Sequence, residues 1–241
     1  MSKTYAVILP TAGQSLRFAH NTSLTTADKK SFVTLAGQAV WLHSVRLFAE
    51  RPEVRQLLVV ISPEDRPFVT DQFRAEIETY GLELVDGGRE RVDSVQNALR
   101  QVRNELDMIA VHDAARPCVT ARQITDVFKA AERTGAAMLA SPIVGTIKRG
   151  QSGNGEHSIV ETVPRDNLWE AQTPQVFDRQ LLLEAYAHRD DFMPTDDAQL
   201  VERLGRAITL VPCDRTNLKI TTQADLDLAE TILVNNSRNG A

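Results

Sequence analysis

The sequence predicts a Rossmann-like α/β fold, in which a mainly parallel sheet carries helices on both faces. Short β-branched apolar runs recur along the chain, each followed by loop-forming residues, at residues 6–9, 57–61, 82–85, 108–111, 137–140 and 208–211. Between them, apolar residues recur at steps of three and four, as in residues 92–102 and 124–131, which indicates amphipathic helices. Continuous apolar strands separated by helices are typical of parallel sheets covered on both sides, which bind ligands beyond the carboxyl ends of their strands.

Length and composition predict one domain of ordinary size spanning residues 1–241, because a chain of 241 residues, 42% of them apolar, can bury one full core. The 27 Lys and Arg against 32 Asp and Glu give a net charge of −5, which argues against a nucleic-acid or anionic membrane surface. Cys118 and Cys213 lie far apart without metal-ligand spacing, which favours a reducing compartment. The apolar residues 5–9 are too few for a signal peptide or membrane span. We expect a cytoplasmic protein.

Residues 142–168 interrupt the alternation of strands and helices. A glycine-rich turn separates two short stretches that alternate in polarity, which predicts a projecting β-hairpin. An isolated hairpin is marginally stable in water, so we expect this segment, called the arm below, to pack on a dimer partner. A loosely held insertion is the alternative.

The first candidate binding segment, residues 9–17, directly follows the first predicted strand. Its small residues would let backbone N–H groups approach phosphates, and Arg17 would add positive charge. The segment matches neither common glycine-rich nucleotide motif, since Lys29-Lys30-Ser31 lacks a correctly placed glycine before it. An ordinary strand-to-helix turn would explain it as well.

Two further segments follow the third and fourth predicted strands. Gly87 and Gly88 precede a helix N-terminus, which suits an anion or the edge of a base, although a plain turn would also fit. In residues 112–117, Asp113 could hold a divalent cation and Arg116 a phosphate, with two alanines leaving room for ligand. A structural ion pair is the alternative there, and we interpret His112 as a satisfied neighbour rather than a catalyst.

The last two segments are residues 164–174 and 217–221. The first leads out of the arm, and its Trp169 favours packing over binding. The second precedes a helix expected to start near Thr222, and its Lys219 could be either a solvated charge or a phosphate ligand. Neither segment decides a function alone.

Together, the five segments resemble the 2-C-methyl-D-erythritol 4-phosphate cytidylyltransferases over nearly the whole chain. The most specific match is His112-Asp113-Ala114-Ala115-Arg116-Pro117. It is reinforced by Asp86-Gly87-Gly88 with Arg91 and Ser94, by Leu168-Trp169 with Thr173-Pro174, and by Asn217-Leu218-Lys219-Ile220-Thr221. The resemblance implies transfer of CMP from CTP to the 4-phosphate of methylerythritol, with release of pyrophosphate, in the non-mevalonate route to isoprenoid precursors. It also implies Mg²⁺ and a homodimer.

The resemblance assigns roles to individual residues. The catalytic cations are Arg17, Lys30 and Lys219. The nucleotide-binding residues are Thr11, Ala12, Gly13, Gly88 and Ser94, with Gly13 on the triphosphate and the others on cytosine and ribose. Asp113 falls at the metal and acceptor position. The other acceptor-binding residues are Arg116, Thr146, Arg165, Thr173 and Thr195, of which Thr146 and Arg165 lie on the arm and would reach the partner's acceptor phosphate.

The chain departs from the usual family pattern at a few positions. Thr11 stands where a small alanine is usual and Ser15 where glycine is common, Arg89 replaces an acidic or small residue, and the choice of Lys30 over Lys29 is a judgement. Three alternatives stay open: another polyol phosphate such as ribitol 5-phosphate as acceptor, a non-catalytic nucleotide-binding dimer, and a dehydrogenase. The last is least favoured because the first loop lacks the dinucleotide glycine pattern.

Overall fold

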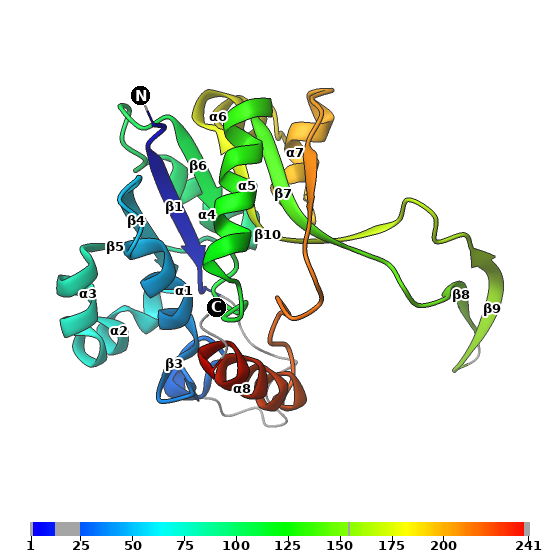
Figure 1. Ribbon diagram of the computed structural model, residues 1–241, viewed down its shortest axis with the longest axis horizontal. Coiled ribbons are helices and arrows are strands. Elements are labelled where there is room, and N and C mark those ends of the chain that lie inside the picture. Colours follow the sequence, from blue (N-terminus) through cyan, green and yellow to red (C-terminus); the bar gives the residue numbers. More distant parts are fainter. Residues whose placement is uncertain (1, 13–24, 154, 239–241) are drawn as a thin grey trace.

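The computed structural model describes residues 2–12, 25–153 and 155–238. Its centre is a seven-stranded sheet with the order β11-β7-β10-β6-β1-β4-β5 (Figure 1). The strands are β1 (Tyr5–Pro10), β4 (Val54–Ile61), β5 (Leu82–Asp86), β6 (Met108–Val111), β7 (Ala136–Pro142), β10 (Trp169–Asp178) and β11 (Thr209–Pro212). All neighbours pair in parallel except β10, which is antiparallel to both β6 and β7. The predicted mainly parallel sheet is confirmed.

Helices cover both faces of this sheet, as the buried apolar strands predict. Alternate residues of β1 point to opposite faces: Tyr5, Val7 and Leu9 belong to one apolar cluster, Ala6 and Ile8 to the other. The first cluster includes side chains of α1 (Val40–Ala49), α2 (Arg66–Gln72) and α5 (Ala121–Thr134), and partly buried side chains of α3 (Arg74–Tyr80) pack against it. The second includes side chains of α4 (Arg91–Leu99), α6 (Arg179–Ala187) and α7 (Ala198–Arg203).

Helix α5 shows how local sequence fixes these elements. Thr120 caps its N-terminus by accepting a hydrogen bond from the Gln123 N–H, and the Gln123 side chain accepts from the Thr120 N–H. The helix ends at Gly135, whose φ of +82° is the left-handed conformation that glycine adopts without strain. Its Phe128 ring stacks on Tyr5 of β1 at a centroid distance of 4.0 Å, which fixes the helix against the sheet.

Strand β10 is the one strand of the central sheet that the sequence analysis did not predict. Its residues were expected only to lead out of the arm, yet they form a ten-residue strand between β6 and β7. The pairing with β7 shifts register between Ala171 and Gln175, around the buried polar residues Gln172 and Thr173. Those polar residues break the apolar run by which a central strand is recognised.

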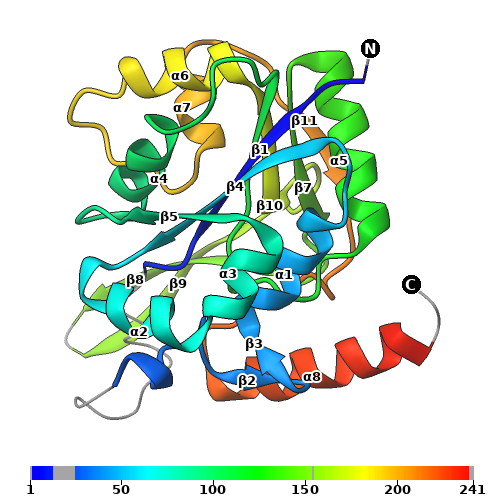
Figure 2. The same ribbon diagram turned by 90° about the vertical axis from the view of Figure 1, so that its left-hand side faces the viewer.

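Helix α8 (Gln223–Arg238) lies at the end of the molecule opposite the N-terminus, beside the small pair β2 (Thr34–Leu35) and β3 (Gln38–Ala39) (Figures 1 and 2). The helix begins next to Thr222, as expected from the sequence. A third apolar cluster, containing Leu35, Ile220 and Ala229, joins it to the body. Within the described residues, no helix is long and apolar enough to cross a membrane.

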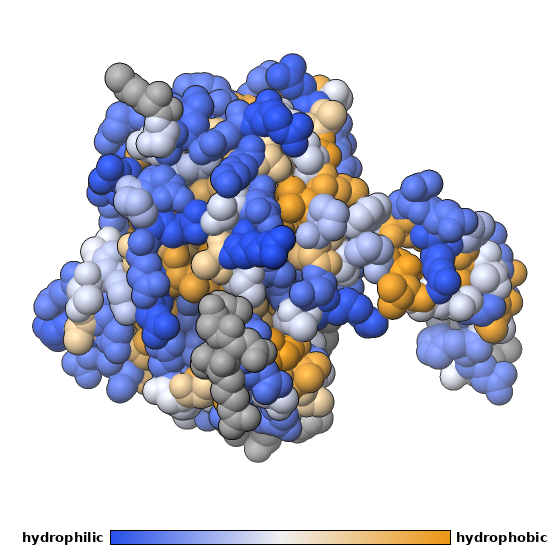
Figure 3. Space-filling view, in the orientation of Figure 1, coloured by the Kyte–Doolittle hydropathy of each residue, from blue (hydrophilic) through white to orange (hydrophobic). Residues whose placement is uncertain are grey.

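The arm is a two-stranded antiparallel hairpin, β8 (Ile147–Gly153) and β9 (Glu156–Val163), which projects from the body (Figure 1). Nearly every residue of both strands is exposed. Large apolar side chains are exposed on the arm and at its root, where hydrophobic surface is visible in the space-filling view (Figure 3); they are Val144, Ile159, Val160, Leu168 and Trp169. The hairpin is therefore as predicted, while the expected packing of Trp169 is incomplete, since 36% of it is exposed.

Candidate active site

A cleft of about 340 Å³ opens at the carboxyl ends of β1 and β5, where parallel sheets bind ligands. Its lining combines four cationic side chains, Lys30, Arg89, Arg91 and Lys219, with two carboxylates, Glu90 and Asp113. The remaining lining residues are Pro10, Thr11, Ala12, Ser31, Ser94 and Ala115. An acidic protein therefore concentrates positive charge at one site, which favours a polyanionic ligand.

The cleft brings together six of the residues predicted for the site: Thr11, Ala12, Lys30, Ser94, Asp113 and Lys219. Gly88 lies directly beside them, hydrogen-bonded to Ser94. Gly13 and Arg17, together with Ser15, lie outside the described residues. Five predicted acceptor residues are not in the lining: Arg116, Thr146, Arg165, Thr173 and Thr195. The structure thus gathers the described residues predicted to bind nucleotide at one cleft of a single chain.

The loops after β1 and β5 meet closely at the mouth of the cleft. The Thr11 hydroxyl donates to the Val60 carbonyl at 2.7 Å, so it is tied to the sheet instead of projecting into the loop. A Cβ on Gly87 would lie 2.7 Å from the Ala12 Cβ, which explains why glycine is needed there. The Gly88 N–H donates to the Ser94 hydroxyl at 3.0 Å, which fixes this loop on the first turns of α4.

Asp113 is the electrostatic centre of the site. One carboxylate oxygen lies 3.2 Å from Arg91 Nε, and the other lies 2.7 Å from Lys219 Nζ. Burial alone would raise the pKa of Asp113, but the positive charges of Arg91 and Lys219 outweigh it and hold the pKa well below its usual range. The carboxylate is therefore ionised and oriented before any ligand arrives.

The backbone of the 112–117 loop explains how Lys219 reaches Asp113 from a distant part of the chain. The Ile220 N–H donates to the Ala115 carbonyl at 2.8 Å, and Arg116 Nη1 donates to the Asn217 carbonyl at 2.8 Å. These two hydrogen bonds flank Lys219 and hold its strand-like segment alongside the loop. The two predicted motifs are thus joined by one main-chain hydrogen bond and one hydrogen bond from the Arg116 side chain.

Arg91 belongs to a buried network that sequence reasoning missed. Its Nη2 lies 2.9 Å from Asp197 Oδ2, and Tyr186 donates to Asp197 Oδ1 at 2.5 Å. Burial would lower the pKa of Arg91, but the charges of Asp197 and Asp113 raise it, so the guanidinium stays protonated. Arg91 was noted only as part of a motif, and no pattern in the sequence links it to Asp197, which comes after α6 in the chain.

His112 is a structural neighbour of Asp113, as predicted. Its Nε2 lies 3.2 Å from both Ser44 Oγ and the Arg116 carbonyl, and its Nδ1 lies 3.2 Å from Thr173 Oγ1. Because the Arg116 carbonyl can only accept, Nε2 carries the proton of a neutral ring, and Nδ1 then accepts from the Thr173 hydroxyl. The same Thr173 oxygen accepts from the Asp113 N–H at 3.0 Å. Burial lowers the pKa of His112 to about 4, which keeps the ring neutral.

Arg116 and Thr173 lie behind Asp113 rather than in the cleft wall. Arg116 is 7% exposed, and its Nε has no hydrogen-bond partner within the described part of the chain. Thr173 is 4% exposed, and its hydroxyl accepts a hydrogen bond from the Asp113 N–H and shares another with His112 Nδ1. Their acceptor-binding roles stay predictions, with Thr173 already serving to orient Asp113.

The side chains of the adjacent Lys29 and Lys30 lie in different places. Lys30 lines the cleft, whereas the Lys29 ammonium lies 2.6 Å from the buried Asp65 carboxylate. The choice of Lys30 as the cleft residue therefore agrees with the geometry. Thr146, Arg165 and Thr195 are exposed and away from the cleft, so a role for the first two at an acceptor site depends on a partner chain.

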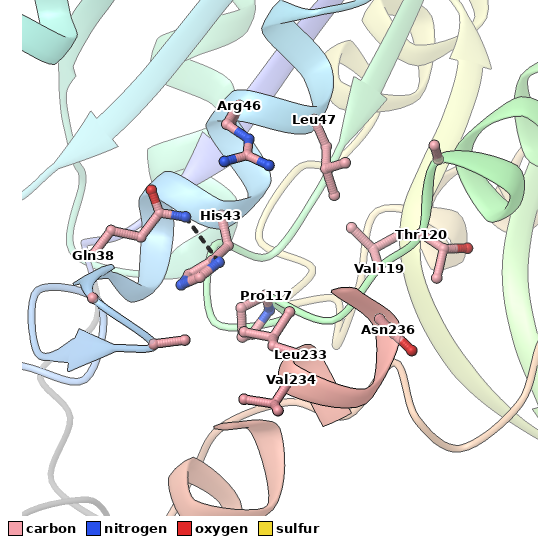
Figure 4. A pocket seen from close by; sticks show the side chains of 13 residues that line it. Gln38, His43, Arg46, Leu47, Pro117, Val119, Thr120, Leu233, Val234 and Asn236 are labelled. Carbon is pink, nitrogen blue, oxygen red and sulfur yellow. Dashed lines mark hydrogen bonds between the residues drawn. The ribbon is translucent and has the colours of Figure 1, made fainter. Parts of the chain in front are cut away.

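A second pocket, of about 390 Å³, lies between α1, the 117–121 loop and α8 (Figure 4). His43 is held there by Gln38 at Nδ1 and by the Leu35 carbonyl at Nε2, at 2.9 and 2.8 Å. Arg46 pairs with Glu50 at 3.4 Å. Because His43 and Arg46 are already engaged and no charged residue of a predicted motif lines it, this pocket is a poor candidate for the chemistry.

The fold and the basic cleft define an α/β nucleotidyltransferase. The model of the 2-C-methyl-D-erythritol 4-phosphate cytidylyltransferase family matches residues 5–235, and the chain belongs to this family.

Relatives of that name are similar over nearly the whole chain. The protein from Rhodopirellula baltica is 39% identical over 239 residues, covering 95% of this chain and 94% of its own. The protein from Solibacter usitatus is 37% identical over 231 residues, covering 95% of each chain. The crystal structure of the Francisella tularensis 2-C-methyl-D-erythritol 4-phosphate cytidylyltransferase superposes with a TM-score of 0.78 at 28% identity, covering 95% of this chain and all of that one.

The low pKa of His112 predicts a pH dependence of stability. The unfolded chain takes up the proton near pH 6.5 and the folded chain near pH 4, so the neutral ring stabilises the fold fully above pH 6.5. This stability is lost as the pH falls between those values, by about 3 kcal/mol. In urea denaturation, His112→Gln should remove that part of the slope. His43, whose pKa burial also lowers, supplies the residual slope of the same sign. Equal slopes in both proteins would contradict the assignment.

The close packing at Gly88 predicts a loss of nucleotide affinity in Gly88→Ala. The added Cβ would lie 2.4 Å from the Asp93 Cβ, so the loop must shift away from the cleft. We expect calorimetric titration with CTP and Mg²⁺ to show binding weakened by about tenfold or more. The matched control is Gly145→Ala, where the added Cβ meets nothing within 4 Å and wild-type affinity is expected. Unchanged binding in Gly88→Ala would remove this loop from the nucleotide site.

Proposed function

We propose that this chain transfers CMP from CTP to 2-C-methyl-D-erythritol 4-phosphate, releasing pyrophosphate and forming 4-diphosphocytidyl-2-C-methyl-D-erythritol. The observation that carries the proposal is the Asp113–Arg91–Lys219 cluster in the cleft. It stands in a chain that matches the cytidylyltransferase family over residues 5–235. Such a site has cations for two phosphate-bearing substrates and no obvious nucleophile of its own.

The reaction needs positioning more than acid-base chemistry. The second pKa of a phosphate monoester is about 6, so at neutral pH the acceptor phosphate is already a dianion with a nucleophilic oxygen. That oxygen forms a bond to the α-phosphorus of CTP while the bond from this phosphorus to the bridging oxygen breaks, and the electron pair leaves with pyrophosphate. No proton moves in this step. Lys30, Lys219 and Arg17 would hold the two anions in line and stabilise the leaving charge.

The cleft residues fit a magnesium ion brought in by the nucleotide. Within the described residues, no group of three His, Cys, Asp or Glu side chains could hold a metal alone. Asp113 offers an ionised carboxylate with further lone pairs, and Mg²⁺ is commonly held by one or two carboxylates together with substrate phosphates. Bound there, Mg²⁺ would neutralise phosphate charge.

We further propose that the protein is a cytoplasmic homodimer, joined through the arm. The arm's strands pair only with each other among the described residues, and their exposed apolar side chains include Ile159 and Val160. A partner chain that covers these side chains would place its own acceptor site near Thr146 and Arg165 of this chain. Two unpaired cysteines and an intracellular nucleotide substrate support the cytoplasm.

Pyrophosphate release tests the reaction directly. Purified protein with Mg²⁺, CTP and methylerythritol 4-phosphate should release pyrophosphate, whereas ATP, GTP, UTP or ribitol 5-phosphate in place of the cognate substrate should give little. Lys219→Ala should lower kcat at least about 100-fold, because it removes a charge from the reacting phosphates. Lys129→Ala, on the exposed side of α5, is the control. Activity with ribitol 5-phosphate but not with methylerythritol 4-phosphate would show that the proposed acceptor is wrong. Binding of CTP without release of pyrophosphate would refute catalysis.

Mixing two variants tests the reach of Arg165 across a dimer. If Arg165 serves the partner's site, Arg165→Ala and Lys219→Ala homodimers are both impaired, but each heterodimer contains one site with both residues intact. Random exchange of subunits should therefore restore about a quarter of wild-type activity. A mixture no more active than its two components would place Arg165 in its own protomer's site or in none.

A further inference from the structure

Lys29 and Lys30 are adjacent in sequence, but only Lys30 lines the cleft. The Lys29 ammonium lies 2.6 Å from Asp65 Oδ2 and 3.7 Å from Glu64, and 15% of its side chain is exposed. Lys29 is thus held by two carboxylates outside the cleft, while its neighbour in sequence forms part of the cleft wall.

Asp65 holds more than this lysine. It lies in the short helix η2 (Pro63–Asp65) after β4, and its side chain is 1% exposed. Its Oδ1 accepts from the Thr26 hydroxyl at 2.7 Å, while its Oδ2 accepts from Lys29. Although Asp65 precedes α2, its carboxylate does not cap that helix. A buried carboxylate is costly unless paired, so these two contacts fix the Thr26–Lys29 stretch to the sheet.

The chain is fixed again immediately after Lys30. Phe32 is 6% exposed and packs against Phe68 and Phe73, with ring centroids 6.0 and 6.2 Å apart. The Phe32 N–H donates to the Lys29 carbonyl at 2.8 Å. Lys30 therefore stands in a tight turn between an ion pair on one side and an aromatic contact on the other.

We propose that Asp65 is a positioning residue for the transfer reaction: by pairing with Lys29 and Thr26 it holds the turn that directs Lys30 into the nucleotide cleft. The inference rests on the proposed function for its kinetic consequence, but its geometric basis lies outside the cleft. It also gives Lys29 a role as an anchor, so that removing Lys29 should affect the nucleotide through Lys30.

Asp65→Asn tests this role, because it removes the charge while keeping the shape. We expect the Kd and KM for CTP to rise about tenfold, since the turn is no longer held, while the KM for the acceptor stays unchanged. Lys29→Met should reproduce this shift, and Lys29→Arg, which can still pair with Asp65, should restore wild-type CTP affinity. If Asp65→Asn does not fold, the two Lys29 variants decide the question.

Glu64→Gln is the matched control, because Glu64 is 69% exposed and lies 3.7 Å from the same ammonium, a longer contact than that of Asp65. This variant should bind CTP as the wild type does. A lower melting temperature with unchanged CTP affinity, or equal rises in both KM values, would overturn the proposal. Calorimetric titration with CTP and Mg²⁺ needs no turnover. If the wild type binds CTP but releases no pyrophosphate, the proposed function fails while the ratio of Kd values still decides the role of Asp65. A wild type that binds no CTP refutes both.

Discussion

The ionised carboxylate of Asp113, buried between Arg91 and Lys219, joins parts of the chain that are far apart in sequence. It follows β6, while Arg91 begins α4 and Lys219 comes from the segment before α8. Because only 12% of the Asp113 side chain is exposed, removing either partner would leave its carboxylate largely out of water with less compensating charge, although the partly exposed Arg91 and Lys219 are themselves screened by solvent. The cluster therefore constrains the fold and also fixes the positions of the charges that face the ligand.

This arrangement explains how a protein with net negative charge can work on two anionic substrates. The cations are gathered at the carboxyl ends of the strands, and their own counter-charges, Asp113 and Asp197, keep them oriented before ligand binds. Preorganised charge is effective because no reorientation is needed as charge develops in the transition state. The surrounding neutral groups, His112 among them, support this cluster without taking part in proton transfer.

Much of this architecture could be predicted because the apolar strands and the motifs at their ends are local features. Residues 112–117 and Lys219 were linked by resemblance, and the link is made by one main-chain hydrogen bond, from Ile220 to Ala115, and one from the Arg116 guanidinium to the Asn217 carbonyl. Strand β10 escaped prediction because Gln172 and Thr173 are polar yet buried through specific hydrogen bonds. Lys29 and Lys30 look alike in sequence, and the difference depends on Asp65, 36 residues away from Lys29. Arg165 lies exposed on the arm, where its guanidinium donates to the Val144 carbonyl, and nothing in its local sequence indicates what it binds.

The way in which the arm joins the sheet has a consequence for how such proteins diverge. The arm leaves the sheet through β7 and returns through β10, and these strands pair with each other up to Pro142 and Trp169 at its root. Residues added or lost at the hairpin tip therefore change no pairing in the seven-stranded sheet. Evolution can lengthen, shorten or change the exposed surface of the hairpin while Thr173, on the returning strand, keeps its place beside Asp113. The surface of the arm and the loops of the cleft are free to evolve at different rates.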